Sequence, residues 1–341
     1  MKKILVFSCL LLVAVQYGPA AYAQGSNVQD HDKRAQSGLM FLDISMSPRA
    51  AAMGDAVSAL DMNSSTAMFY NPASMATLEG GSIGLGTVQW SATDIQYNQA
   101  SVAFSPSGGR YGVIGVSVQA ADYGNLQGTI IDPDPESKGY IDIGNFSPTA
   151  LAVGVGYARS LSDRFSVGGV IKYAHQSLGE SQMDLEGNTK GNSVSTPVAD
   201  FGVLYRTGFK SLNLAVTARN FSPAVTYEEE SFEAPLSINI GLAMNVFDLV
   251  APSLTSQSFL VSVEGGHPRS YDEQIRLGGE YRFMNLLSLR AGYAFPSDEQ
   301  SISLGAGLNV DIGTIRLGAD YAFTQFGDLG NMNRIGVNVG F

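Results

Sequence analysis

The three histidines are the residues that could take part in acid–base catalysis, and they are far apart in the sequence. They are His31, His175 and His267. Hydrolysis by a serine nucleophile needs a histidine beside the serine and a third polar group that orients the histidine. Because serines are common in the chain, a chance serine–histidine pair would be weak evidence. We therefore assign no catalytic residue and expect a protein that is not an enzyme.

Metal and cofactor sites are also poorly supported by the residue types. Cys9 is the only cysteine, and three scattered histidines do not make a transition-metal site. Two acidic runs, 132–136 and 228–230, offer oxygen ligands for calcium, but neither has the spacing of an EF-hand, and solvated loop charge is the better interpretation. The Gly-x-Gly sequences at 84–86 and 154–156 lack the strand–turn–helix context of a dinucleotide site. We assign no metal ligand and no cofactor.

The other charged residues alternate with apolar ones, which indicates β-strands. From Gln274 to Phe341, apolar side chains recur at every second position, which is the period of a strand. Tyrosine and phenylalanine fall near the strand ends, where membrane barrels carry their aromatic belts. Strands of about ten residues are long enough for a tilted strand to cross a bilayer. These features predict an all-β protein, a transmembrane antiparallel β-barrel.

The same alternation extends back to residue 81 and predicts about fourteen strands, an even number as in single-chain bacterial barrels. The predicted strands are 81–90, 97–106, 111–122, 148–159, 164–176, 196–206, 211–221, 235–246, 258–266, 274–284, 287–296, 301–310, 314–324 and 333–341. Short links alternate with long ones, and the long links belong on the outer side. The link 247–257 is rather long for the periplasmic side, so a misplaced strand is most expected there.

The first 23 residues have the features of a secretory signal peptide. Two lysines precede the apolar run Ile4–Val15, which is shorter than a membrane helix, and Ala21-Tyr22-Ala23 fits a cleavage site. The mature chain would begin at Gln24 and be more acidic than the net charge of −11 of the full chain, which argues against nucleic acid as a partner. We expect a signal peptide at 1–23, a periplasmic leader and N-terminal plug at 24–79, and the barrel at 80–341 in the outer membrane of a Gram-negative bacterium.

The segment from Ser37 to Leu78 differs from the strands because its apolar residues do not alternate. Its alanine-rich middle predicts a helix with Ser47 as N-cap and Pro48 at the first helical position. A second short helix around 65–69 would stop at the turn 71–74. Physical reasoning leaves two alternatives open, a plug folded into the lumen or a small periplasmic cap.

Three stretches of this segment resemble the N-terminal signature of the PorV/PorQ family of outer-membrane proteins. They are GLMFLDI at 38–44, PRAAAMGDA at 48–56 and AMFYNPASMA at 67–76. That family is itself similar to the FadL long-chain fatty acid transporters, which share the Asn-Pro-Ala turn. The resemblance implies a fourteen-stranded barrel with an N-terminal helical plug in the lumen, surrounded by outer-membrane lipid.

The resemblance implies two alternative functions. PorV-like members belong to type IX secretion and bind secreted cargo proteins and other secretion components. FadL-like members pass long-chain fatty acids or other hydrophobic small molecules through a kinked wall, with a plug that shifts on ligand binding. The signature is closer to PorV/PorQ, so the first function is the main expectation and hydrophobic transport is the alternative.

The candidate binding residues lie in the plug and on the lumen face of the barrel. They are Asn71, Pro72, Arg49, Arg276, Arg290 and Arg316. We expect the lumen-facing charges mainly to form salt bridges with one another and to anchor the plug through Asp43, Asp55 and Asp61. These lumen-facing charges are Lys172, Arg219, Arg276, Glu280, Arg282, Arg290, Arg316, Asp320 and Arg334.

Overall fold

The computed structural model describes residues 37–341, apart from 135, 137, 183–186, 228–229, 298–299, 301 and 328–329. The predicted signal peptide and the first part of the predicted leader lie outside the described residues. Among the described residues, no helix has both the length and the apolar character needed to cross a bilayer.

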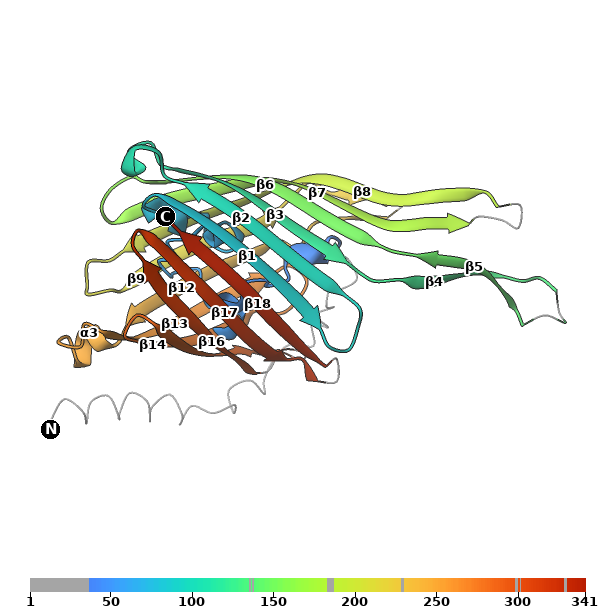
Figure 1. Ribbon diagram of the computed structural model, residues 1–341. Helices are drawn as coiled ribbons and strands as arrows, with labels where there is room; N and C mark the ends of the chain where they lie inside the picture. The colour runs from blue at the N-terminus through green and yellow to red at the C-terminus, as the bar shows by residue number, and fades with distance from the viewer. Residues whose placement is uncertain are drawn as a thin grey trace, which may run out of the picture. The chain divides into compact units, whose positions relative to one another are not determined.

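Fourteen antiparallel strands form a closed barrel in which the first and last strands pair, with Ser82 opposite Gly340 and Trp90 opposite Met332 (Figure 1). The predicted strand number and fold class are confirmed. The barrel strands are β1 (Gly81–Trp90), β2 (Gln96–Phe104), β3 (Val113–Asp122), β6 (Thr149–Ser160), β7 (Phe165–Gln182), β8 (Thr189–Arg206), β9 (Asn213–Phe221), β12 (Ser237–Asn245), β13 (Gln257–Pro268), β14 (Gln274–Phe283), β15 (Leu287–Phe295), β16 (Ile302–Ile312), β17 (Ile315–Gln325) and β18 (Asn331–Gly340).

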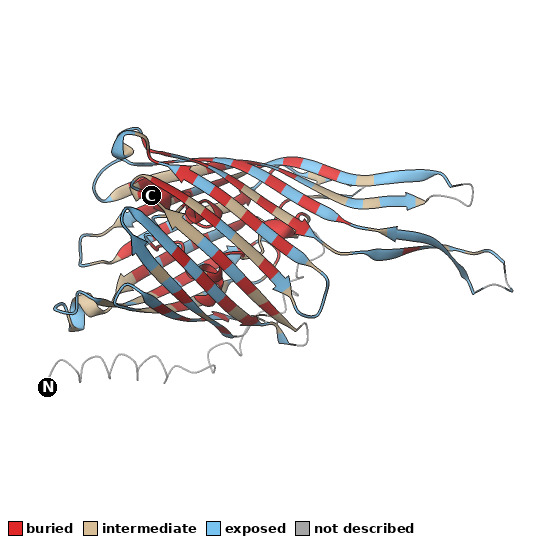
Figure 2. Cartoon of the chain, viewed as in Figure 1, coloured by how far each residue is buried: buried red, intermediate tan, exposed pale blue. Residues whose placement is uncertain are grey.

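Buried and exposed residues alternate along each barrel strand, which Figure 2 shows as stripes across the wall. In β15, Leu289, Tyr293 and Phe295 are 51%, 44% and 61% exposed, whereas Ser288 and Arg290 are buried. The outer surface is therefore apolar and the polar residues face a filled interior. A soluble barrel would have the opposite arrangement, because water favours polar groups outside.

The links between strands are long at one end of the barrel, here called the long-loop end, and mostly short at the other, the short-turn end. At the long-loop end, β7 and β8 continue beyond the barrel, and β4 (Leu126–Ile131) pairs with β5 (Tyr140–Phe146) in a projecting hairpin (Figure 1). β10 (Val225–Thr226) pairs with β11 (Ser231–Phe232) in a second small sheet there. The suspect link at the short-turn end holds the short helix α3 (Phe247–Val250), so no strand is misplaced there.

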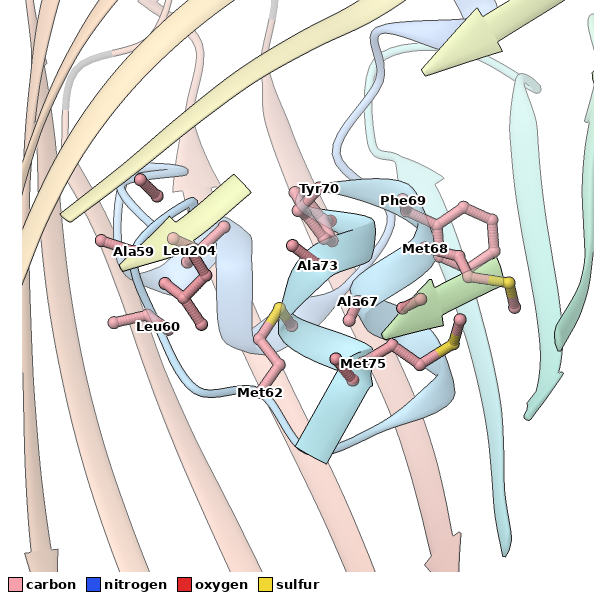
Figure 3. Packing of buried hydrophobic residues seen from close by; sticks show 14 of the residues in the cluster. Ala59, Leu60, Met62, Ala67, Met68, Phe69, Tyr70, Ala73, Met75 and Leu204 are labelled. Atoms are coloured by element: carbon pink, nitrogen blue, oxygen red, sulfur yellow. The ribbon is translucent and has the colours of Figure 1, made fainter. Parts of the chain in front are cut away.

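The plug consists of short helices that fill the lumen: η2 (Met40–Leu42), α2 (Pro48–Ala52), η3 (Ser65–Phe69) and η4 (Pro72–Thr77). Most of its apolar side chains are buried, in a cluster drawn in Figure 3. Ser47 precedes α2 as predicted, but its side chain makes no capping bond. The expected stop at 71–74 instead begins η4, because Asn71 caps that helix by accepting a hydrogen bond from the Ala73 amide at 3.0 Å.

Helix α2 is short because the chain turns sharply where it meets the wall. Gly54 and Asp55 both have left-handed backbone angles, with φ of 61° and 60°. A Cβ on Gly292 of β15 would lie 2.0 Å from the Gly54 nitrogen. The backbones of plug and wall are therefore in direct contact, and a side chain on Gly292 would push them apart.

The plug enters the barrel at the long-loop end and leaves it at the short-turn end. Ser37 forms an isolated β-bridge with Glu233, and the Ser270 hydroxyl donates a hydrogen bond to the Ser37 hydroxyl at 2.6 Å. Glu233 and Ser270 both belong to links at the long-loop end. At the other end, Gly81 and Phe341 exchange backbone hydrogen bonds of 2.7 and 3.0 Å. The predicted periplasmic leader before Ser37 lies outside the described residues and stays a prediction.

This direction predicts different labelling of two cysteine variants if the long loops face the cell exterior. Ser37→Cys should react with an impermeant maleimide on intact cells, because Ser37 is partly exposed at the long-loop end. Glu79→Cys, exposed beside the start of β1, should react only after the envelope is opened. Labelling of Glu79→Cys but not Ser37→Cys on intact cells would reverse the orientation.

Candidate functional site

A buried ionic cluster joins the plug to the wall around Glu280 of β14. Arg49 of α2 donates from Nε and Nη2 to the two carboxylate oxygens of Glu280, both at 2.9 Å. Arg290 of β15 donates to Glu280 at 2.6 Å and to Asp320 of β17 at 2.6 Å, and Arg282 reaches Glu280 at 2.9 Å. Of the predicted binding residues, the structure brings Arg49 and Arg290 together in this cluster.

The geometry of this cluster indicates that it fixes the plug to the wall rather than binding a ligand. Arg49 binds its carboxylate in the bidentate fork that makes arginine pairs strong and directional. Charges taken out of water are tolerated only when they are paired and hydrogen bonded, and Glu280 is 2% exposed with three arginines around it. The Glu280 carboxylate therefore has little capacity left for a ligand, and its role is to hold α2 against the wall.

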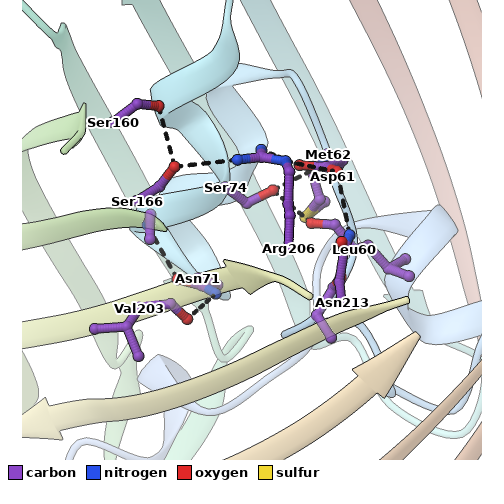
Figure 4. Close-up of polar contacts among 12 residues, drawn as sticks. Leu60, Asp61, Met62, Asn71, Ser74, Ser160, Ser166, Val203, Arg206 and Asn213 are labelled. Atoms are coloured by element: carbon purple, nitrogen blue, oxygen red, sulfur yellow. Dashed lines mark hydrogen bonds and ion pairs between the residues drawn. The ribbon is translucent and has the colours of Figure 1, made fainter. Parts of the chain in front are cut away.

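Asn71 and Pro72 attach the plug to strands β7 and β8. The Asn71 amide donates to the Ser58 carbonyl at 2.7 Å and to the Val203 carbonyl at 3.2 Å (Figure 4). A Cβ on Gly202 would lie 2.1 Å from Asn71 Oδ1, and one on Gly168 would lie 2.5 Å from the Pro72 carbonyl carbon. The Asn-Pro turn therefore fits against two wall glycines, and its polar atoms are used within the protein.

A second ion pair lies near the short-turn end. Arg206, the last residue of β8, pairs with Asp61 of the plug, and the Asn213 amide donates to the same carboxylate at 3.1 Å (Figure 4). Asp61 anchors the plug as expected, but its partner Arg206 was not among the expected residues. In the sequence, only the lumen-side position of Arg206 at the end of a strand could have indicated this role.

The two remaining arginines occupy different places. Arg276 of β14 faces the lumen, with Nη1 3.5 Å from the Glu264 carboxylate, which also accepts the Ser58 amide at 2.9 Å. Arg316 is 67% exposed in its side chain and pairs with Asp311, which is 65% exposed, at 3.0 Å. The placement of Arg316 in a lumen site is therefore wrong. Arg316 is at a lumen-facing position of β17 but lies at the end of the strand, beyond the packed interior.

A polar pocket of about 180 Å³, here called the vestibule, lies between plug and wall at the long-loop end. Its charged lining residues include Asp43 and Asp55 from the plug and Arg219, Arg276 and Arg334 from the wall. Tyr70 also lines it, and the Arg219 guanidinium lies over the Tyr70 ring at 5.5 Å. Burial raises the pKa of the Tyr70 phenol, and the nearby Asp55 carboxylate raises it further, so the hydroxyl stays neutral.

A second hollow, here called the wall depression, lies on the barrel wall across β1, β2, β3 and β18. Its volume is about 440 Å³ and its lining is mostly apolar, with the small residues Gly86, Ala100, Ala120 and Gly336 among larger ones. The wall is thin here, because a Cβ on Gly86 would lie 3.1 Å from the Met46 carbonyl oxygen and one on Gly336 would lie 2.8 Å from Pro48. The plug segment Met46–Pro48 therefore lies directly behind the wall depression.

Comparison with known proteins defines the fold. No protein-family model matches this sequence, and no curated protein matches it. The toluene transporter TbuX of Ralstonia pickettii matches 86% of this chain and 97% of its own with a TM-score of 0.56 at 14% identity. A FadL homologue of Pseudomonas aeruginosa matches 87% of this chain and 98% of its own with a TM-score of 0.55 at 11% identity. This chain has a FadL-like barrel fold.

The toluene transporter TodX of Pseudomonas putida has the same likeness, with a TM-score of 0.55 at 14% identity over 86% of this chain and 96% of its own. None of these matches supports the PorV/PorQ part of the sequence resemblance, whereas they do support its FadL-like part. At such low identity the FadL-like likeness establishes architecture, and the function has to be argued from the sites.

The structure gives little support for a catalytic or metal site among the described residues. His175 Nδ1 lies 2.8 Å from Ser195 Oγ on the exposed part of β7 and β8, but no third group orients this histidine among the described residues. His267, near the end of β13, pairs with Glu273 of the following link at 3.1 Å, and both side chains are exposed. The described residues contain no group of three or more histidine, cysteine or acidic side chains able to hold a metal ion. In the first acidic run, Asp132 and Asp134 accept hydrogen bonds from backbone amides at 3.1 and 3.0 Å.

Proposed function

We propose that this protein is an outer-membrane barrel that passes hydrophobic small molecules from outside the cell to the bilayer through its wall. The apolar outer surface suits a lipid surround, and the long-loop end faces outward as in other bacterial barrels. The solved structures that support the FadL-like fold include two toluene transporters, which favours this substrate class.

The observation that carries the proposal is the position of Met46–Pro48 between the vestibule and the wall depression. Ser45 lines the vestibule, and the next residue, Met46, lies behind Gly86 of the wall depression. Arg334 also lines the vestibule and donates to the Ser45 carbonyl at 2.7 Å, while its neighbours Ile335 and Gly336 line the wall depression. Movement of this short plug segment would connect an outward-facing pocket with a lipid-facing hollow.

The wall is closed in the observed state. Strand β1 keeps its register with β2 and β18 past Gly86, which pairs with Gln99 on one side and Gly336 on the other. Because Gly86 and Gly336 have no side chains, only strand backbone separates the plug from the wall depression at this point. Transport in this proposal depends on plug movement rather than on a permanent hole.

The proposal predicts that filling the wall depression stops uptake. Ala100 points outward from β2 into the wall depression and does not pack on the plug. Ala100→Trp should lower uptake of labelled oleate at least tenfold, at unchanged outer-membrane level, in cells lacking their own fatty acid transporter. The matched control is Ala291→Trp, an outward-facing alanine of β15 on another part of the wall, which should leave uptake unchanged. Equal uptake by Ala100→Trp and wild type would contradict the lateral route.

A second candidate function is the PorV/PorQ-type one, binding of secreted proteins, and the β4–β5 hairpin favours it. This hairpin projects from the barrel (Figure 1). Its side chains Ile131 and Tyr140 are 84% and 50% exposed. Exposed apolar side chains usually mark a contact surface only where they form a larger patch. Deleting 129–142 separates the two functions in the same cells. Under the transport proposal, oleate uptake persists and no protein is lost from purified outer-membrane complexes. Loss of a copurifying secreted protein with normal uptake would favour the second candidate.

A further inference from the structure

The vestibule separates charges of opposite sign onto two surfaces. Its basic residues Arg219, Arg276 and Arg334 come from the wall, on β9, β14 and β18. Its acidic residues Asp43 and Asp55 come from the plug. The loop residue Asp272 adds one further carboxylate from the wall side. A molecule in the vestibule would therefore face negative charge on one side and mostly positive charge on the other.

Of the three wall arginines of the vestibule, Arg276 pairs with Glu264 at 3.5 Å, whereas Arg219 and Arg334 have no ion-pair partner among the described residues. Among the described residues, no carboxylate lies within 4.0 Å of the charged nitrogens of Arg219 or Arg334. Arg219 Nε is buried and has no hydrogen-bond partner in the described part of the chain. Arg334 donates to the neutral groups Ser45 O, Thr324 Oγ1 and Met332 Sδ at 2.7, 2.7 and 3.2 Å. Because each guanidinium group carries five N–H donors, Arg219 and Arg334 keep donors beyond these bonds that a ligand carboxylate in the vestibule can use.

The acidic side has spare capacity as well. The Asp43 carboxylate makes no hydrogen bond or ion pair with a described residue, although it is only partly exposed. The Asp55 carboxylate accepts a hydrogen bond from the Ser45 hydroxyl and has acceptor positions left. These two carboxylates and the arginines face a shared space, so charge on a ligand can be matched at both of its ends.

The size of the vestibule limits the ligand. At about 180 Å³ it is smaller than the roughly 300–1,000 Å³ of pockets for drug-sized molecules. A small molecule with two charged groups fits this volume, whereas the mostly polar lining does not favour a long hydrocarbon chain as a resident ligand in the observed state. The vestibule thus selects for charge and size, unlike the apolar wall depression.

We propose that the vestibule binds a small zwitterion of the α-amino acid type, with its ammonium group toward Asp43 and Asp55 and its carboxylate toward Arg219 and Arg334. Charge-assisted hydrogen bonds at both ends give affinity and reject molecules that carry one charge, because one surface is then left unpaired. A bound zwitterion also links the plug to the wall. The binding site does not depend on whether hydrophobic molecules cross the wall.

Calorimetric titration of the purified full-length barrel in a nonionic detergent tests this with three probes of related carbon skeleton. L-Leucine carries both charges, 4-methylpentanoate lacks the ammonium group, and 3-methylbutylamine lacks the carboxylate. Leucine should bind at least tenfold more tightly than either analogue. Arg219→Gln and Asp43→Asn should each weaken leucine binding at least tenfold, while Arg316→Gln, which changes an exposed arginine at the short-turn end, should not.

Each other outcome overturns the assignment. If 4-methylpentanoate binds as tightly as leucine, the vestibule is an anion site; if the amine does, it is a cation site. If no probe binds, or if Arg316→Gln weakens binding as much as Arg219→Gln does, the vestibule is not the zwitterion site. Each variant should retain the heat-modifiable band of the folded barrel. A variant that keeps this band but loses binding has not lost its fold. Oleate uptake is not part of this readout, so failure here and failure of the transport proposal are distinguishable.

Discussion

Deletion of residues 37–62 is expected to give an inserted barrel with ion-conducting steps that the intact protein lacks. This segment includes η2, α2 and the polar plug–wall contacts of Arg49, Ser58 and Asp61. A barrel of fourteen strands is wider than the eight-stranded barrels that side chains alone can fill, so a lumen that keeps only η3 and η4 should hold water. Planar-bilayer recordings of the purified protein measure the effect.

A matched deletion separates plug loss from general damage. Removing 129–142 shortens the projecting β4–β5 hairpin, which lies outside the barrel wall and makes no lumen contact (Figure 1). That variant should show no new conductance. If the 37–62 deletion inserts with a normal heat-modifiable band but conducts no more than the intact protein, the segment does not close the lumen.

Glu280→Gln is expected to cause the largest loss of stability among single substitutions in the plug–wall contact. The change leaves Arg49, Arg282 and Arg290 without the carboxylate that they share at 2.9, 2.9 and 2.6 Å. Removing one partner of a buried ion pair costs about 3–5 kcal/mol, because the remaining charge is left in a place with little water. The measurement is the denaturant midpoint in lipid vesicles, followed by the fluorescence of Trp90, the only tryptophan.

Two further variants should lose less stability than Glu280→Gln does. Arg49→Met should cost less than Glu280→Gln, because Arg282 and Arg290 still pair with the carboxylate. Asp311→Asn, which breaks the exposed pair with Arg316, should have little effect because water screens that pair. A Glu280→Gln midpoint equal to that of Asp311→Asn would mean that the buried cluster does not stabilise the barrel.

Alternation along the chain was enough to predict the barrel. Every predicted strand corresponds to an observed one, and β1 has the predicted bounds of 81–90. The reason is physical: in a membrane barrel, lipid and lumen impose opposite polarity on neighbouring residues, so each strand carries its own local pattern. The extensions of β7 and β8 beyond the barrel were missed because strands in water at a loop end are not required to alternate.

Tertiary structure alone decided how the plug is held in the barrel and the roles of its residues. Arg49 and Glu280 are 231 positions apart, and Asp61 and Arg206 are 145 apart, so no local pattern links them. Asn71 and Pro72 were predicted as binding residues, and only the packing against Gly202 and Gly168 shows that they hold the plug to the wall. The sequence by itself determined the strands, the barrel and the polarity of its two faces, because these depend on neighbours in the chain. The direction of the plug, the charge separation of the vestibule and the thin wall behind the depression depend on contacts between distant segments, which only folding brings together.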